Sequence, residues 1–189
     1  MLVNHELKMA FVHAPKCAGL ALSQWLAEHY GFEEFAEPNS FCPDSEIELI
    51  ERHRYVIPIE LLSYEVITCV REPIERWESF CLYYSLQLGV NETFEEFTRD
   101  KLNFLPLQKR YTEKATYILG VESLDSEVLK LPFMKRPVPE ITRYNVSRDM
   151  RDYHEIKQRI VWTDELRNQV VDHFRDDYKK IRTLTRSAS

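Results

Sequence analysis

Two stretches of almost continuous apolar residues predict buried strands, one over residues 8–13 and a longer, β-branched one over Tyr64–Arg71. Each is followed by a turn and then by a segment in which apolar residues recur at helical spacing. The first of these helices is predicted to end at Gly31, and the second to begin at Pro73, a favoured first-turn residue. Because continuous apolar strands are typical of a parallel sheet covered on both faces, the pattern predicts an α/β domain.

The rest of the pattern predicts shorter elements and one clear C-terminal helix. That helix is expected to begin after Thr163, whose hydroxyl can cap it, and to run as a single apolar stripe to Ile181. The other expected elements are loops at 32–44 and 132–148, helices at 45–53, 92–100, 105–113 and 122–131, and a strand at 116–119. Since no linker or repeat interrupts the 189 residues, we predict a single domain over residues 1–189.

Composition excludes several classes of function. Acidic residues outnumber basic ones by 31 to 25, and the net charge of −6 argues against a broad surface for nucleic acid or an anionic membrane. The chain has only 4 glycines, none of them close neighbours. Neither a dinucleotide-binding glycine loop nor a GxxxxGK[ST] loop can therefore form, which also disfavours a kinase. A small basic pocket for one anionic ligand remains compatible with this composition.

The four cysteines, Cys17, Cys42, Cys69 and Cys81, have neither the spacing of a zinc site nor the density of a disulfide scaffold. Cys17 does not fit the CX5R pattern of a phosphatase, because Ser23 stands where arginine is required. No apolar run reaches the length of a signal peptide or a membrane span. We therefore expect no metal, reduced thiols and a cytoplasmic location.

Basic side chains follow both predicted strands, at the edge where a parallel sheet binds its ligands. Lys16 lies in the first turn, ahead of a helix whose N-terminal N–H groups and dipole favour an anion. Arg71 ends the second strand with a guanidinium suited to a phosphate, and Ser79, further along the helix, can add a hydroxyl. Arg76 is expected to be structural, paired with the sheet or an acidic neighbour. Two anion sites at two strand ends suit a ligand with two separated phosphates.

Both segments resemble motifs of one protein family. FVHAPKCAGLALSQWL, residues 11–26, resembles the 5′-phosphosulfate loop of sulfotransferases, and VITCVREPIERWESFCLYY, residues 66–84, resembles their 3′-phosphate motif. LPLQKRYTEKATYILGVESL (105–124) and TDELRNQVVDHFRDDYKKI (163–181) are similar to later blocks of the same family, in the same order. The chain thus resembles the carbohydrate-modifying branch of the sulfotransferases that depend on 3′-phosphoadenosine 5′-phosphosulfate (PAPS).

The resemblance implies a three-layer α/β/α sulfotransferase fold, similar to P-loop folds, with a mostly parallel central sheet. It also implies transfer of a sulfuryl group from PAPS to a hydroxyl acceptor without a metal, which releases 3′-phosphoadenosine 5′-phosphate (PAP). Lys16 would hold the 5′-phosphate and stabilise the charge that develops on it. The residues implied to bind the cofactor with Lys16 are Cys17, Ala18, Gly19, Leu20 and Ala21 at the 5′-phosphate and Arg71 and Ser79 at the 3′-phosphate.

A base must take the proton of the acceptor hydroxyl, and the family resemblance places it before the second strand. His53 is the expected base, since an ordinary imidazole pKa of about 6.5 suits this task, and Glu51 is the alternative. We expect the acceptor to be a carbohydrate or another small alcohol. Little chain remains for an acceptor-binding insert, so the cleft is either open or completed by a second subunit in a homo-oligomer.

The chain departs from the family pattern directly after Gly19. Leu20 and Ala21 stand where the family usually has two hydroxyl residues. Backbone N–H groups and Lys16 would then have to hold the 5′-phosphate without side-chain hydroxyls. The alternative to an active sulfotransferase is a non-catalytic nucleotide-binding or regulatory protein that kept the fold.

Overall fold

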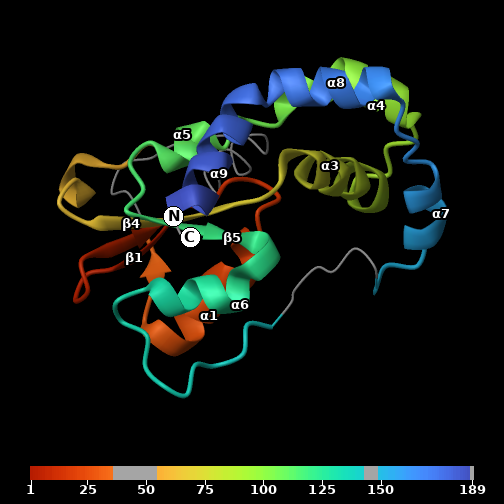
Figure 1. Cartoon of the computed structure of the whole chain (residues 1–189). Helices are drawn as coiled ribbons and strands as arrows, with labels where there is room; N and C mark the ends of the chain where they lie inside the picture. The colour runs from red at the N-terminus through yellow and green to blue at the C-terminus, as the bar shows by residue number, and fades with distance from the viewer. Residues whose placement is uncertain (36–54, 143–148, 188–189) are drawn as a thin grey trace. The chain divides into compact units, whose positions relative to one another are not determined.

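The computed structural model describes residues 1–35, 55–142 and 149–187, and the chain divides into two compact units (Figure 1). The first unit comprises Met1–Val70 and Arg110–Thr142, and the second comprises Arg71–Lys109 and Arg143–Ser189. The single domain expected over residues 1–189 stays a prediction. The helix expected at 45–53 lies outside the described residues.

The first unit is built on a five-stranded sheet with the strand order β3-β1-β2-β4-β5. The strands are β1 (Leu2–Asn4), β2 (Met9–Phe11), β3 (Glu33–Glu34), β4 (Glu65–Val70) and β5 (Tyr117–Gly120). The α/β class is confirmed, and β2, β4 and β5 are parallel neighbours. However, β1 runs antiparallel to both β2 and β3. The sheet is therefore mixed, and the expectation of a mostly parallel sheet is wrong.

The difference comes from a hairpin at the start of the chain. Between β1 and β2 the chain turns over residues 5–8, where Asn4 Oδ1 accepts a hydrogen bond of 2.9 Å from the Leu7 N–H and Lys8 adopts a left-handed φ of 52°. A connection this short can join only antiparallel strands. The polar residues that interrupt the apolar pattern near the N-terminus are therefore the turn of a hairpin.

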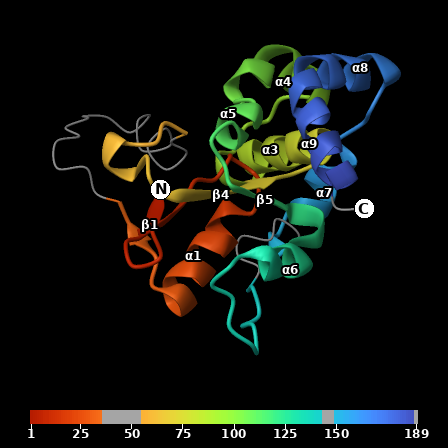
Figure 2. The same ribbon diagram turned by 60° about the vertical axis from the view of Figure 1, so that its left-hand side comes forward.

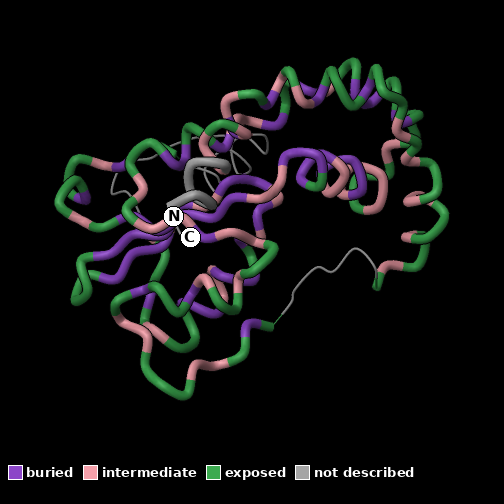
Figure 3. Tube along the Cα trace, in the orientation of Figure 1, coloured by how far each residue is buried: buried purple, intermediate pink, exposed green. Residues whose placement is uncertain are grey.

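Helices α1 (Gly19–Tyr30) and α6 (Leu124–Glu127) lie on the same face of this sheet in both views (Figures 1 and 2). α1 buries Trp25 almost completely, and the Trp25 Nε1 donates a hydrogen bond of 3.0 Å to the Pro139 carbonyl. As predicted, α1 ends at Gly31, which has a left-handed φ of 65° and donates its N–H to Leu26 O. β1, β2 and β4 are buried almost throughout (Figure 3), so they form the core that α1 covers.

The second unit is helical and packs around one tryptophan. Its elements are α3 (Pro73–Gln87), α4 (Phe94–Lys101), η2 (Leu102–Phe104), α7 (Tyr153–Gln158), α8 (Asp164–His173) and α9 (Arg175–Ser187). Trp77 is fully buried between the rings of Phe80, Phe97 and Phe174, and its Nε1 donates to Thr98 Oγ1 at 3.0 Å. The shorter turns of the chain are η1 (Ile59–Leu61), α5 (Lys109–Thr112), η3 (Val121–Ser123) and η4 (Val128–Lys130).

Two predicted helix starts are confirmed, and one predicted helix is divided. Pro73 occupies the first turn of α3, and the Thr163 side chain accepts a hydrogen bond from the Leu166 N–H at the start of α8. The helix expected to continue to residue 181 is instead two helices that meet at Phe174. The Phe174 N–H still donates to Val170 O, so the helical spacing of apolar residues continues across the break. The sequence pattern therefore gives no sign that the helix is divided.

Candidate functional site

The turn between β2 and α1 carries the first predicted anion site, and its backbone is strained. Lys16 and Ala18 have left-handed φ values of 66° and 54°. For residues with a side chain this conformation costs roughly 1–2 kcal/mol each. Such strain persists only where the surroundings impose it, and it is frequently found at binding sites.

Buried contacts hold this turn in shape. Cys17 is fully buried, and its N–H donates to the Ala14 carbonyl at 3.3 Å. Gly19 lies directly against the imidazole of His13, so a Cβ at position 19 would come within 2.0 Å of His13 Cδ2. The His13 ring is also stacked against the ring of Phe11, at a centroid distance of 5.7 Å. Glycine is therefore required at position 19 by packing.

The N-terminus of α1 presents backbone donors without a side-chain cap. Ala18 is the N-cap residue and offers no side-chain acceptor, and the first turn contains no acidic residue. The first helical N–H to find its acceptor is that of Leu22, which donates to Ala18 O at 3.1 Å. The N–H groups of Gly19, Leu20 and Ala21 thus lack an intrahelical acceptor. Together with the Lys16 ammonium, such a helix start can hold an anion.

The second predicted anion site begins where β4 ends, and there the structure fixes the backbone of Arg71. The Arg71 N–H donates to Gln108 Oε1 at 2.7 Å, and the Arg71 carbonyl accepts from Gln108 Nε2 at 2.9 Å. Gln108 is only 1% exposed. The buried Gln108 amide therefore satisfies the backbone N–H and carbonyl of Arg71, as a neighbouring strand does for the residues of β4.

The Arg71 side chain is partly buried and lies near the Glu75 carboxylate. Its Nε is buried without a hydrogen-bond partner in the described part of the chain, and Glu75 Oε2 lies 3.7 Å away from it. Ser79 follows one further turn along α3, on the face that carries Glu75. Arg71 precedes α3 and Ser79 lies about two turns along it, so the spacing of Arg71, Glu75 and Ser79 places them on one side of this helix.

The N-terminus of α3 itself is closed to an external anion. The Glu72 side chain accepts a hydrogen bond of 2.8 Å from the Glu75 N–H, and the Tyr178 hydroxyl also donates to this carboxylate. Burial and the Glu72 carboxylate together raise the pKa of Tyr178, which remains a donor. Any anion bound at this motif must therefore be held by side chains such as Arg71 and not by the helix end.

Arg76 is structural, as predicted. It is fully buried, donates to the Pro106 carbonyl at 2.9 Å, and has its Nη1 3.8 Å from Oδ2 of the fully buried Asp177. Glu75, one helical turn from Arg71, is an ion-pair partner that the sequence already offers. The contacts of Gln108 and Asp177 were not predicted, because these residues lie far from Arg71 and Arg76 in the sequence.

The structure groups some of the predicted residues and leaves others aside. Lys16 to Ala21 form the turn before α1 and its first residues in the first unit, whereas Arg71 precedes α3 and Ser79 lies within it in the second unit. His53 and Glu51, the two candidate bases, lie outside the described residues. The choice between them therefore stays open.

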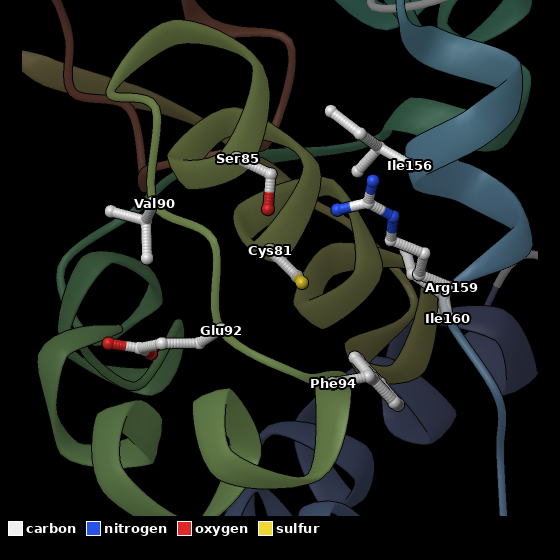
Figure 4. A pocket seen from close by; sticks show the side chains of 8 residues that line it. All are labelled: Cys81, Ser85, Val90, Glu92, Phe94, Ile156, Arg159 and Ile160. Carbon is white, nitrogen blue, oxygen red and sulfur yellow. The ribbon is translucent and has the colours of Figure 1, made fainter.

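The second unit also contains a small cavity lined by α3, the start of α4 and α7 (Figure 4). It measures about 260 Å³ including its open mouth, and Cys81, Ser85 and Arg159 are among its lining residues. Burial raises the pKa of the Cys81 thiol to about 12, so this sulfur is protonated and a poor nucleophile. The cavity is small for a nucleotide, and none of the predicted site residues that the structure describes lines it.

Within the described ranges, no group of three or more histidine, cysteine, aspartate or glutamate side chains could hold a metal ion. Over the same ranges no helix combines the length and apolar character needed to cross a membrane. No family model, no curated protein and no solved structure matches the chain. The functional conclusion therefore depends on the motifs and on the local geometry of the two turns.

Proposed function

We propose that this protein is a PAPS-dependent sulfotransferase that acts on a hydroxyl group of a carbohydrate or another small alcohol. The observation that carries the proposal is the pairing of β2 with β4 as parallel neighbours. The chain leaves the sheet at the same edge after both strands, and Lys16 follows one strand while Arg71 follows the other. A ligand with two separated phosphates, as in PAPS, suits this order of elements.

In the proposed reaction, the acceptor oxygen attacks the sulfur atom in line with the bond to the 5′-phosphate. A new S–O bond to the acceptor forms, the S–O bond to the phosphate breaks, and PAP leaves. Lys16 and the N–H groups at the start of α1 stabilise the negative charge that develops on the leaving phosphate. The acceptor proton passes to His53, or to Glu51 in the alternative assignment.

A non-catalytic nucleotide-binding protein is the second candidate, and one observation favours it. Leu20 occupies the first turn of α1 with a side chain that is 49% exposed, at a position where a hydroxyl would otherwise face the phosphate. If backbone donors and Lys16 bind the cofactor without orienting the sulfuryl group, PAPS binding would continue without transfer.

The test is transfer of labelled sulfur from PAPS to a panel of monosaccharides, oligosaccharides and simple alcohols. We expect Lys16→Ala to lower turnover by roughly 10²- to 10³-fold, as is typical when one group that stabilises developing charge is removed. Alanine keeps the Cβ, so the left-handed backbone at this position costs the same in both proteins. Lys16→Arg retains the charge, and Lys114→Ala removes an exposed lysine elsewhere in the same unit.

Two outcomes would change this conclusion. Normal turnover in Lys16→Ala would remove Lys16 from the mechanism. Binding of PAPS by the wild-type protein with no transfer to any hydroxyl compound would favour the non-catalytic protein.

A further inference from the structure

A buried chain of polar contacts runs from α9 to the backbone of Arg71. The Arg76 guanidinium pairs with the Asp177 carboxylate, which also accepts hydrogen bonds of 2.9 Å from the N–H groups of Gln108 and Lys109. The Gln108 side chain then makes its two hydrogen bonds to the Arg71 backbone. Arg76, Asp177 and Gln108 are each at most 1% exposed, so water does not compete for these contacts.

The geometry leaves Gln108 little freedom. Its Oε1 faces an N–H and its Nε2 faces a carbonyl, so only one orientation of the amide satisfies both groups. Its own backbone N–H is fixed by Asp177 at the same time. The side chain therefore holds the backbone of Arg71 beyond the last regular pair of β4, Val70 with Gly120.

We propose that Gln108 is a positioning residue that orients Arg71 toward the 3′-phosphate of the nucleotide. This inference rests on the proposed function, because it assigns a role at the same site. Arg71 follows β4 directly, and its Nε is buried without a hydrogen-bond partner among the described residues. A guanidinium recognises a phosphate through the direction of its N–H groups. A change in the Arg71 backbone therefore changes the direction of all these N–H groups together.

A positioning role and a merely structural role predict different results. Loss of a structural contact lowers the fraction of folded protein, which weakens the apparent binding of every ligand alike. Loss of positioning weakens the contact with one phosphate. The ratio of the dissociation constants for AMP and PAP separates the two, because AMP lacks only the 3′-phosphate.

The experiment is calorimetric titration of the wild-type protein, Gln108→Met and Gln108→Glu with PAP and AMP. Methionine has a similar shape but makes neither hydrogen bond, whereas glutamate keeps the acceptor for the Arg71 N–H. We expect Gln108→Met to lower the AMP-to-PAP ratio about tenfold, the cost of about one well-oriented hydrogen bond to a charged group, with AMP binding unchanged. Gln87→Met, at an exposed position of α3, is the control and should keep the wild-type ratio.

An unchanged ratio in Gln108→Met would overturn the inference, even if the variant is less stable. If Gln108→Met does not fold, Gln108→Glu decides: it loses only the hydrogen bond to the Arg71 carbonyl, so we expect a smaller decrease in the ratio, and an unchanged ratio would overturn the inference. If the wild-type protein binds PAP no more tightly than AMP, this result contradicts the proposed function itself. That failure is visible without any variant and so is distinct from failure of the positioning role.

Discussion

Single residues on α3 determine how available the Arg71 guanidinium is to a ligand. Glu75 Oε2 lies 3.7 Å from Arg71 Nε, and this pair is partly exposed to solvent. A bound phosphate would take the same donors and would also meet the negative charge of Glu75. Glu75 should therefore weaken the binding of an anion at Arg71 without closing the site.

We expect Glu75→Gln to increase the affinity for PAP a few-fold, because exposed ion pairs contribute about 0.2–1 kcal/mol. Calorimetry at low ionic strength measures the change, and AMP binding should stay constant. Glu95→Gln, an exposed acid in the first turn of α4, provides the matched control. A weaker affinity for PAP in Glu75→Gln would instead indicate that Glu75 supports Arg71.

Gly19 illustrates a residue whose role only the folded structure reveals. We expect Gly19→Ala to lower the free energy of unfolding by about 1–3 kcal/mol, because the added Cβ overlaps the His13 ring. The higher helix propensity of alanine, worth about 1 kcal/mol, does not offset this overlap. Urea denaturation measures the change. In the control Gly120→Ala the new Cβ meets its nearest atom at an ordinary 3.7 Å, and equal stability losses in both variants would contradict the explanation.

Among individual residues, the positions of those near a strand end could be predicted. Arg71 directly follows β4, and Lys16 lies in the short turn after β2, whereas their role in a binding site stays a prediction. The contact between Gln108 and Asp177 could not be predicted, because 69 positions separate them along the chain. Only packing of the second unit brings such residues together.

The helix termini that carry a capping or breaking residue, at Gly31, Pro73 and Thr163, are the features that the sequence defines best. Thr163 was expected to cap a helix, and its hydroxyl accepts from the Leu166 N–H at 3.2 Å. We expect Thr163→Ala to lower the free energy of unfolding by about 1 kcal/mol, measured by urea denaturation, while Thr163→Ser keeps the cap and the stability. Equal losses in both variants would show that the methyl group of Thr163, and not its hydroxyl, matters.

Strand pairing was less predictable than helix ends. The segment at Leu2–Asn4 is too short for its apolar residues to form a recognisable period, so β1 was missed and the sheet was expected to be mostly parallel. The two antiparallel pairings have different causes: β1 with β2 depends on the hairpin turn, and β1 with β3 depends on a contact between segments distant in sequence. The central parallel strands β2 and β4 were predictable because their side chains are buried on both faces.

For the whole molecule, neither compact unit is a continuous segment of the chain. The first unit ends at Val70, resumes at Arg110 and ends again at Thr142. No shift in composition marks these positions, so the sequence favours one domain throughout. The three-layer α/β/α arrangement stays a prediction.

The pH dependence of stability is expected to include His173 at the end of α8. Burial lowers the pKa of His173 from its ordinary value of 6.5, and the nearby Asp177 carboxylate only partly opposes this. The unfolded chain therefore binds more protons than the folded chain, so stability present above pH 6.5 is lost as the pH falls through the lowered pKa. We expect His173→Gln to reduce the loss of unfolding free energy between about pH 7 and pH 5.

Urea denaturation over this pH range measures the effect. His154→Gln changes an exposed histidine of α7 in the same unit and should reproduce the wild-type curve. If the His173→Gln curve runs parallel to the wild-type curve, His173 does not contribute to the pH dependence.

The most direct test of the central claim is calorimetric titration of the protein with PAP, with AMP and ADP as comparison ligands. We expect PAP to bind at least about tenfold more tightly than either, because only PAP offers a 3′-phosphate to Arg71. Arg71→Ala should abolish this preference, while Arg99→Ala, at an exposed position of α4, should retain it. Equal binding of PAP and AMP, or a preference that persists in Arg71→Ala, would contradict the assignment of this protein as a PAPS-dependent enzyme.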